Sequence, residues 1–513
     1  MDSLEAEIEE VIEADDRGIT SDRRAMTATT ETRQQLLIGG RWREGAAGRE
    51  YEQRFPFTGE VVGSAVAAER EDARAAVDAA RAAFGEWSHS APAQRRSILL
   101  RAADLLMERQ QDIARLVTAE TGGVFGWGMF NVELAAGMLR EAAAQAYWLT
   151  GDVIPSDVPG KLAMGVRQPA GVVAAIAPWN APVILATRAV AAPLAYASTV
   201  VLKASEICPR THAAVVRALA DAGTPDGVIN LVTNDPADAA EVVEELIAHP
   251  AVRRINFTGS TKVGRVIAEK AGRHLKRVLL ELGGKAPMVV LADANLERAA
   301  AAASFGAFFH QGQICMSTER LVADRAIAGE LSEKLAQRAG ALPVGDPREP
   351  TTAIGPLVNA AAVERVAGLV KDAVAKGSEV LTGGEPEGPC FPPTVLADVT
   401  PEMRIYAEES FGPVVAVVPV DGPDDAVRVA NDTEYGLAAA VFSEDVPAAL
   451  ELAQRIESGI CHVNDTTVHD EPQMPFGGVK GSGWGRFGGR AALEEFTELR
   501  WLTVQELPRE YPI

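Results

Sequence analysis

Cysteine is scarce in this sequence, and its few copies lie far apart. The 513 residues contain four of them, Cys208, Cys315, Cys390 and Cys461. None belongs to a C-x-x-C pair and none pairs with a histidine at metal-ligand spacing, so we expect no metal site. A chain of this length can bury a large core without disulfide bridges. We therefore expect no disulfide framework and a reducing, cytoplasmic setting.

Basic residues are also few compared with acidic ones. The chain has 49 Lys and Arg against 71 Asp and Glu, a formal net charge of −22. Nucleic-acid binding depends on clustered Lys and Arg that neutralise phosphates, so we expect no nucleic-acid partner. The same charge argues against binding to an anionic membrane and is consistent with a role in solubility.

The sequence offers neither a secretory signal nor a convincing membrane span. It begins MDSLEAEIEEVIEADD, whereas a signal begins with basic residues and an apolar run. Residues 183–202 are mostly apolar but contain Arg188 and Pro193, so we interpret them as a buried helix followed by a buried strand. Residues 1–33 are predicted to be a weakly ordered extension, and Met26 remains an alternative natural start.

Short apolar runs alternate with alanine-rich helical stretches from residue 171 onward. This alternation is typical of parallel sheets with helices on both faces. Upstream, apolar spacing predicts helices over residues 71–84 and 94–121. Two series of buried strands are predicted, at 171–177, 198–203, 227–233, 252–259 and 277–282, and then at 288–291, 414–420, 438–443 and 459–464.

Two glycine patterns differ in their context. Gly483, Gly485 and Gly488 spell G-x-G-x-x-G, but a dinucleotide fingerprint belongs early in a strand–turn–helix unit, so we interpret this run as a tight loop. The segment FTGSTKVG (257–264) instead follows a predicted strand and leads into a helix. Its Ser260 and the helix N-terminus suit a pyrophosphate, although a plain strand-to-helix turn also explains it.

Polar side chains follow several of the predicted strands. Lys203 and Glu206 could bind a ribose, with Glu206 disfavouring a 2′-phosphate, or could be solvated charges. Asn180 could donate to an oxyanion or cap a turn. Glu281, at the end of an apolar strand, suits a base near neutral pH. Cys315 stands 34 residues later; a lone cysteine is usually an inert core residue, and a reactive one needs an electropositive, partly exposed site.

Taken together and in order, these segments resemble the aldehyde dehydrogenase superfamily. The resemblance extends from about residue 36 to about residue 500. The matching strings are PWN (178–180), LKASE (202–206), FTGSTKVG (257–264), ELGGK (281–285), GQIC (312–315), EESFGP (408–413) and PFGG (475–478).

The resemblance implies roles for individual residues. Cys315 would attack the aldehyde, and Asn180 with the Cys315 backbone N–H would hold the oxyanion. Glu281 would activate the water that hydrolyses the resulting thioester. The cofactor would be NAD, with NADP as an alternative, bound by Trp179, Lys203, Glu206, Gly259, Ser260, Gly264, Leu282, Glu409 and Phe411.

The resemblance also implies an α/β fold with two Rossmann-like parallel-sheet units and an oligomerisation hairpin. Residues 34–282 would bind NAD, with the hairpin at about 150–168, and residues 283–485 would form the catalytic unit. Residues 486–513 would return to the cofactor unit. The hairpin and a strand near residues 500–505 would pair between subunits of a homodimer or homotetramer.

The substrate is predicted to be an aromatic aldehyde. Residues 179–189 and 467–489 look closest to the branch that oxidises benzaldehyde, salicylaldehyde and vanillin. In a helix opened by Asn180, Ala181 and Arg188 share a face, leaving room for a flat ring that Arg188 could meet. Trp127 and Phe476 would complete the pocket. A core salt bridge for Arg188 and a packing role for Trp127 stay open, as does an aliphatic aldehyde or semialdehyde substrate.

One departure and two alternatives remain. Residues 234–238, NDPAD, replace a glycine-rich turn found in many members, so we expect no cofactor contact from this loop. A CoA-acylating enzyme would not need a general base, and Glu281 therefore favours hydrolysis. A non-catalytic protein of the same fold is disfavoured because every position with a chemical role is filled.

Overall fold

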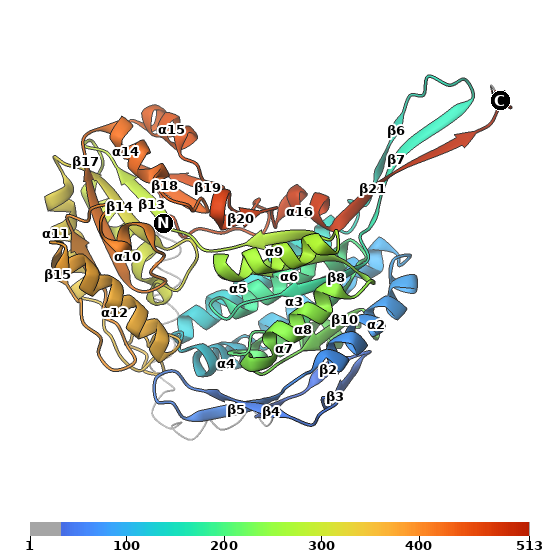
Figure 1. Cartoon of the computed structure of the whole chain (residues 1–513), viewed down its shortest axis with the longest axis horizontal. Coiled ribbons are helices and arrows are strands. Elements are labelled where there is room, and N and C mark those ends of the chain that lie inside the picture. Colours follow the sequence, from blue (N-terminus) through green and yellow to red (C-terminus); the bar gives the residue numbers. More distant parts are fainter. Residues whose placement is uncertain (1–31, 512) are drawn as a thin grey trace.

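The computed structural model describes residues 32–511 and 513, which form an α/β fold with two large sheets and two small ones (Figure 1). The predicted extension, residues 1–33, therefore lies almost entirely outside the described residues. Its last two residues are exceptions, and Arg33 already belongs to strand β1 (Arg33–Gln34), which pairs with β5 (Val61–Val66). With β4 (Glu50–Arg54), these two strands form one of the small sheets.

The first large sheet has a parallel centre built from the first predicted series of strands. All five predicted strands are present within one or two residues of their expected bounds, because each is an apolar run buried on both faces. Their order is β12, β11, β8, β9, β10. These strands are β8 (Val172–Ile176), β9 (Thr199–Lys203), β10 (Ile229–Val232), β11 (Val252–Thr258) and β12 (Arg277–Glu281), with β2 (Leu36–Ile38), β3 (Arg41–Arg43) and β20 (Gly483–Trp484) at the edges.

Helices cover this sheet. The helix predicted over residues 94–121 is two helices, because Arg109 leaves the helical conformation at φ −106° and ψ 13°. The predicted helix over 71–84 is confirmed, and residues 183–202 form a helix followed by a strand. Among the described residues, no helix is long and apolar enough to cross a membrane. The helices are α2 (Arg70–Trp87), α3 (Pro92–Glu108), α4 (Gln110–Thr121), α5 (Phe125–Gln145), α6 (Pro182–Ala195), α7 (Pro209–Asp221), α8 (Ala239–Ala248) and α9 (Thr261–Arg273).

The second large sheet contains the four strands of the second predicted series and three that were not predicted. One of these, β14 (Thr318–Asp324), lies beside β13 (Ala286–Val290) in the middle of the sheet. Its sequence TERLVAD looks polar, yet Glu319 and Arg320 are buried because both find partners inside the protein. The other strands are β15 (Glu379–Thr382), β16 (Thr394–Ala397), β17 (Val414–Val420), β18 (Ala438–Phe442) and β19 (Ile460–Val463).

Helices also flank the second sheet, and one irregular turn among them leads to the candidate nucleophile. The turn η4 (Phe309–Gly312) follows α10 (Leu296–Phe308) directly. The other helices are α11 (Ala328–Gly340), α12 (Ala360–Ala375), α13 (Arg404–Ala407), α14 (Pro423–Asn431) and α15 (Val446–Arg455).

The second small sheet projects from the body of the molecule (Figure 1). It contains β6 (Gly151–Ile154), β7 (Lys161–Pro169) and β21 (Thr497–Gln505), which follows α16 (Gly489–Phe496). The hairpin and the C-terminal strand were expected to pair between subunits. They pair with each other within one chain, in antiparallel register over the full length of β21, so any contact with another subunit must use the outer edges or faces of this sheet.

The run Gly483, Gly485 and Gly488 is a set of tight turns, as predicted. All three residues have positive φ values, 107°, 81° and 77°, and Gly483 begins β20 at the edge of the first sheet. A Cβ atom at Gly483 would lie 2.1 Å from the Leu280 carbonyl oxygen. The chain thus returns to the first sheet at Gly483. This residue lies within 283–485, the range expected for the catalytic unit.

Candidate active site

Cys315 lies just after an irregular turn between the two large sheets. The turn bends sharply because His310 and Gln311 take left-handed conformations, with φ of 49° and 56°. Gly284 packs against the cysteine backbone so closely that a Cβ there would be 2.3 Å from the Cys315 carbonyl oxygen. Cys315 is partly exposed, and all four cysteines are free.

The surroundings of the Cys315 thiol differ from the electropositive site expected of a reactive cysteine. Burial raises its pKa most, and the nearby Glu281 carboxylate raises it further, while Arg188 opposes both. A resting thiolate is therefore disfavoured. The thiol consequently needs a neighbouring base to take its proton when it reacts.

Asn180 is held beside Cys315 by two hydrogen bonds, one from its side chain and one to its backbone. It follows β8, is buried, and its side-chain Nδ2 donates to the Gln313 carbonyl oxygen at 3.0 Å. The Trp127 indole nitrogen donates to the Asn180 carbonyl oxygen at 3.1 Å. An amide nitrogen carries two hydrogens, so Nδ2 retains one for a further acceptor. This geometry suits a donor that stabilises negative charge next to Cys315.

Glu281 ends β12 and is 2% exposed. Its Oε1 accepts a hydrogen bond from the Gly478 N–H at 3.2 Å. Burial raises its pKa to about 8, although Arg188 and Arg486 act in the opposite direction. A carboxyl with this pKa is partly ionised near neutral pH and can accept a proton, as expected for a general base.

Lys203 and Glu206 form an ion pair at the carboxyl end of β9. Burial alone would raise the Glu206 pKa, but the charge of Lys203 and the hydrogen bonds from Lys203, the backbone and Asn234 together lower it, so the carboxylate is ionised. In the loop at 234–238, to which no cofactor contact was assigned, the Asn234 Nδ2 donates to Glu206 at 3.0 Å. The Asn234 Oδ1 is buried and has no hydrogen-bond partner within the described part of the chain. The cluster thus keeps one polar group available for a ligand.

The N-terminus of α9 lies at the end of β11, two strands away from β9 in the same parallel sheet. The Ser260 hydroxyl caps the helix by accepting from the Val263 N–H at 3.4 Å. Gly264 lets this helix approach the next segment, since a Cβ there would be 2.5 Å from Leu282 Cδ2. Gly259 donates its N–H to the Glu281 carbonyl oxygen at 2.9 Å. Free N–H groups at such a helix start suit a phosphate.

Glu409, Phe411 and Trp179 meet across the two units. The Glu409 Oε1 accepts from the Gly284 N–H at 2.8 Å, and burial, with Glu319 nearby, raises its pKa to about 7. The rings of Trp179 and Phe411 lie 5.9 Å apart, edge to face at 83°. Trp179 follows β8, whereas Glu409 and Phe411 follow α13, so this contact joins widely separated segments of the chain.

Two residues that sequence reasoning did not assign hold this segment in place. The Glu319 carboxylate accepts hydrogen bonds from the backbone N–H groups of Ser410 and Phe411, each at 2.9 Å, and forms a buried ion pair with Lys285. Phe411 has a φ of 46°, which this carboxylate supports. Lys285 could have been singled out from the sequence, because it belongs to the matched string ELGGK. Nothing in the sequence indicated that its partner would be Glu319.

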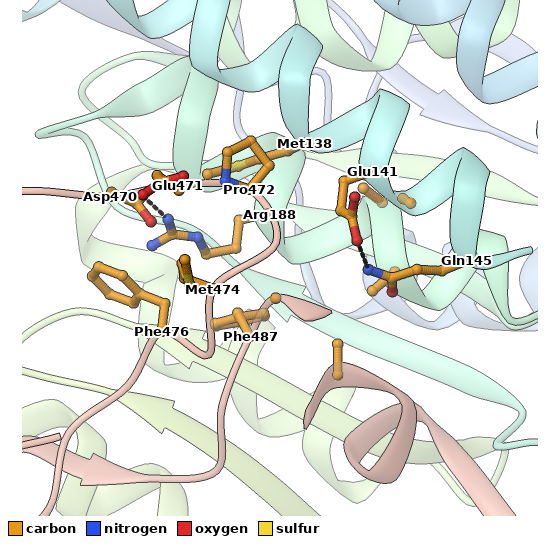
Figure 2. Close-up of a pocket in the computed structure, with 15 residues that line it drawn as sticks. Met138, Glu141, Gln145, Arg188, Asp470, Glu471, Pro472, Met474, Phe476 and Phe487 are labelled. Atoms are coloured by element: carbon orange, nitrogen blue, oxygen red, sulfur yellow. Dashed lines mark hydrogen bonds and ion pairs between the residues drawn. The ribbon is translucent and has the colours of Figure 1, made fainter. Parts of the chain in front are cut away.

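A hollow lies between α5, α6 and the segment that carries Asp470 (Figure 2). The Arg188 guanidinium stacks over the Phe476 ring at 4.0 Å and forms an ion pair with Asp470. Arg188 and Phe476 thus line one cavity, as predicted, and the salt-bridge alternative for Arg188 is also present. The lining includes Met138, Glu141, Gln145, Arg188, Asp470, Pro472, Met474, Phe476 and Phe487.

The other two residues predicted for the substrate pocket are not among those that line this hollow, and their role stays a prediction. Trp127 does not line this hollow; it is buried and stacks on His310 with ring centroids 4.5 Å apart. Ala181 is the N-cap of α6 and is also buried. Trp127 packs next to Asn180 as described above, so the packing alternative accounts for its contacts.

Comparison with known proteins gives a consistent result. A model of the aldehyde dehydrogenase family matches residues 42–502. The chain is 58% identical over 478 residues to a vanillin dehydrogenase of Pseudomonas sp. strain HR199, covering 93% of this chain and 99% of the relative. A solved salicylaldehyde dehydrogenase from Pseudomonas putida G7, complexed with salicylaldehyde, superposes with a TM-score of 0.92 at 43% identity, covering 94% of this chain and 100% of that one. A betaine aldehyde dehydrogenase from Staphylococcus aureus in complex with NAD+ has a TM-score of 0.90 at 32% identity, covering 93% and 96%.

Proposed function

The chain belongs to the aldehyde dehydrogenase family, and from that premise we propose that it oxidises aromatic aldehydes to carboxylic acids with NAD. The observation that carries the aromatic class is the wall formed by Arg188 over Phe476, which offers a flat apolar face and a cation to one bound ring. The vanillin and salicylaldehyde dehydrogenases among its relatives support the same class.

In the proposed mechanism, Cys315 is the nucleophile. Because burial and Glu281 raise the thiol pKa, its proton passes to the Glu281 carboxylate as the sulfur attacks the carbonyl carbon. The Asn180 amide and the Cys315 backbone N–H stabilise the oxyanion that forms. NAD, when bound, supplies the two-electron oxidant. Glu281 releases the thiol proton to solvent, then takes a proton from the water that attacks the thioester and returns it to the departing sulfur, which releases the acid and the free thiol.

The residues present fit a dinucleotide. The Lys203–Glu206 pair, with the unpartnered Asn234 oxygen beside it, suits a ribose, and the α9 start around Ser260 suits a pyrophosphate. Glu409, Phe411 and Trp179 would hold the nicotinamide end. We propose that the first sheet unit, residues 34–282, binds NAD and that residues 283–485 contribute the nucleophile.

Replacing Glu206 with alanine is expected to relax the choice of cofactor. The ionised carboxylate repels a 2′-phosphate, so its removal should improve the ratio of kcat/KM for NADP over NAD by about tenfold or more. The measurement is steady-state reduction of both cofactors with one aldehyde. Glu241→Gln, an exposed carboxylate on α8, serves as a control and should leave the ratio unchanged. Equal kcat/KM for the two cofactors in the wild type would contradict the proposal.

The substrate class is tested with a panel of aldehydes. We expect kcat/KM, followed by NADH formation, to be highest for hydroxylated aromatic aldehydes, lower for benzaldehyde and lowest for aliphatic aldehydes and semialdehydes. An aliphatic aldehyde or semialdehyde at the top of the order would overturn the aromatic assignment. The same reactions with added CoA should still yield the free acid, whereas acyl-CoA would show that CoA resolves the thioester.

We propose that the projecting sheet joins subunits into a homodimer or homotetramer. Its exposed apolar side chains, among them Trp501 at 77% exposure, support this, as do its two open edge strands. Trp501→Lys is expected to lower the mass measured by light scattering. Val446→Lys, on the exposed face of α15, is the matched control. An unchanged mass for Trp501→Lys, or a monomeric wild type, would contradict this assembly.

A cytoplasmic location is part of the same proposal. All four cysteines are free and two of them are buried, which suits a reducing compartment. Titration of four thiols in the denatured protein purified from its native cells would agree with this setting, and the recovery of disulfide-bonded protein would not.

A further inference from the structure

Asp470 is a buried carboxylate to which the proposed mechanism gives no role. It lies on the irregular segment between β19 and β20, and its side chain is only 9% exposed. Its partner is Arg188 on α6, whose side chain is 7% exposed (Figure 2). A backbone N–H of its own segment, that of Glu471, also acts on the carboxylate. The pair thus places two opposite charges in the wall of a hollow that Glu141, Gln145 and Glu471 also line, beside apolar side chains.

Stability alone does not account for this pair. Removing two charges from water costs about as much as their attraction returns, and a pair of apolar side chains of similar size is often at least as stable. The pair is therefore better explained by a role in the reaction that takes place beside it. That chemistry is close, because both Arg188 and Asp470 act electrostatically on Glu281 and on Cys315.

The geometry leaves part of Arg188 available. A guanidinium has five N–H donors in a planar fork. In the described part of the chain, the one hydrogen bond recorded for this guanidinium runs from Nη2 to Asp470, while the flat face lies on the Phe476 ring. Arg188 also lines the hollow. The remaining donors on the edge of the guanidinium can therefore reach an acceptor within it.

We propose that Asp470 is a positioning residue: it holds Arg188 flat on Phe476, so that the free guanidinium N–H groups donate to an oxygen substituent on the ring of the bound aldehyde. In this position Asp470 also keeps Arg188 from forming an ion pair with Glu281. This inference rests on the proposed function, since it concerns the same pocket.

The charged groups around Glu281 determine how the loss of Asp470 would change the Glu281 pKa. Arg188 from α6 and Arg486 from the loop after β20 lower the pKa of Glu281, and Asp470 raises it. Arg486 is tied to backbone oxygens of Gly478 and Gly485, which leaves Arg188 as the cation that can turn. Without the Asp470 charge, the Arg188 charge would act on Glu281 without that opposing effect, and the pKa of the Glu281 carboxyl would fall.

The test compares substrates that differ in ring oxygens. For Asp470→Asn, we expect the ratio of kcat/KM for salicylaldehyde or vanillin over benzaldehyde to fall by about tenfold, mainly through KM of the hydroxylated substrate. We also expect the acidic limb of the kcat profile with benzaldehyde to move to lower pH by about one unit. A purely structural role would lower the rates for all substrates together and would leave the profile in place.

Control variants separate the outcomes. Asp470→Glu keeps the charge and should restore part of the ratio, and Asp465→Asn, an exposed carboxylate earlier on the same segment, should change neither readout. Arg188→Ala alone and combined with Asp470→Asn should give the same ratio, because Asp470 acts through Arg188. If Asp470→Asn does not fold, the apolar double variant Arg188→Met with Asp470→Leu should still oxidise benzaldehyde and lack the preference.

Two results would overturn the inference. An unchanged substrate ratio in Asp470→Asn, with a wild type that favours aromatic aldehydes, would reject the positioning role and leave the proposed function standing. A wild type that does not oxidise aromatic aldehydes would reject the proposed substrate class itself, and the role of Asp470 with it.

Discussion

Replacing Cys315 with alanine should abolish aldehyde oxidation, a loss on the order of 10⁴-fold or more in kcat. Without the thiol, no covalent bond to the carbonyl carbon forms, and neither Asn180 nor Glu281 has a reaction to assist. The measurement is steady-state NADH formation with an aromatic aldehyde at saturating NAD. Cofactor binding should persist, because the residues proposed to hold NAD come from other segments.

A matched control is available in Cys461, the other partly exposed cysteine. Cys461→Ala removes the same group from β19 and should leave kcat unchanged. Activity retained in Cys315→Ala would show that another group attacks the aldehyde, and the proposed mechanism would then be wrong. Loss of activity in both variants would point instead to a general effect on the fold, which thermal unfolding would reveal.

Glu281→Gln should slow both halves of the reaction, because Glu281 is the proposed base in each. Amide nitrogen cannot take a proton, so hydrolysis of the thioester should slow by about 10²- to 10⁴-fold. If thiol attack remains measurable, rapid mixing should then show one equivalent of NADH per active site, followed by slow turnover. Mass spectrometry of the quenched protein should find the acyl group on Cys315.

The pH dependence of the wild type follows from the same residue. Glu281 acts as a base only when ionised, and burial raises its pKa to about 8. The hydrolysis rate should therefore rise with pH through about 8 and level off above it, and Glu281→Gln should lack this rise. Glu379→Gln, an exposed carboxylate on β15, is the control and should keep it. A wild-type profile flat between pH 6 and 9 would argue against Glu281 as the base (the range being roughly that over which such a group titrates).

Much of the fold could be predicted because its signals are local. A strand buried on both faces needs an apolar run, and β8, β9 and β12 each have one within their own residues. β14 was missed for the opposite reason. Its Glu319 and Arg320 are acceptable inside the protein only because Lys285 and the backbone oxygens of Val429 and Ala430 meet them there.

The candidate site divides in the same way. Asn180, Glu281 and Cys315 could be named from the order of their motifs, and the structure brings all three together. The environment of Cys315 could not be foreseen, because the burial and the nearby charges that raise its pKa are supplied by other segments of the chain. Trp127 was expected to line the substrate pocket, which stays a prediction; what the sequence could not indicate is that its indole donates to the Asn180 backbone.

The sequence by itself determined the α/β class, the strand series, the tight glycine turns at 483–488 and the family. These depend on the spacing of apolar residues and on short strings, which are properties of neighbours in the chain. Only the tertiary structure decided which charges meet. Arg188 and Asp470 are 282 positions apart, and many other acidic residues of the chain would have been equally plausible partners from the sequence alone. An ion pair is a property of distance in space, and the folding of α6 against the segment after β19 sets that distance.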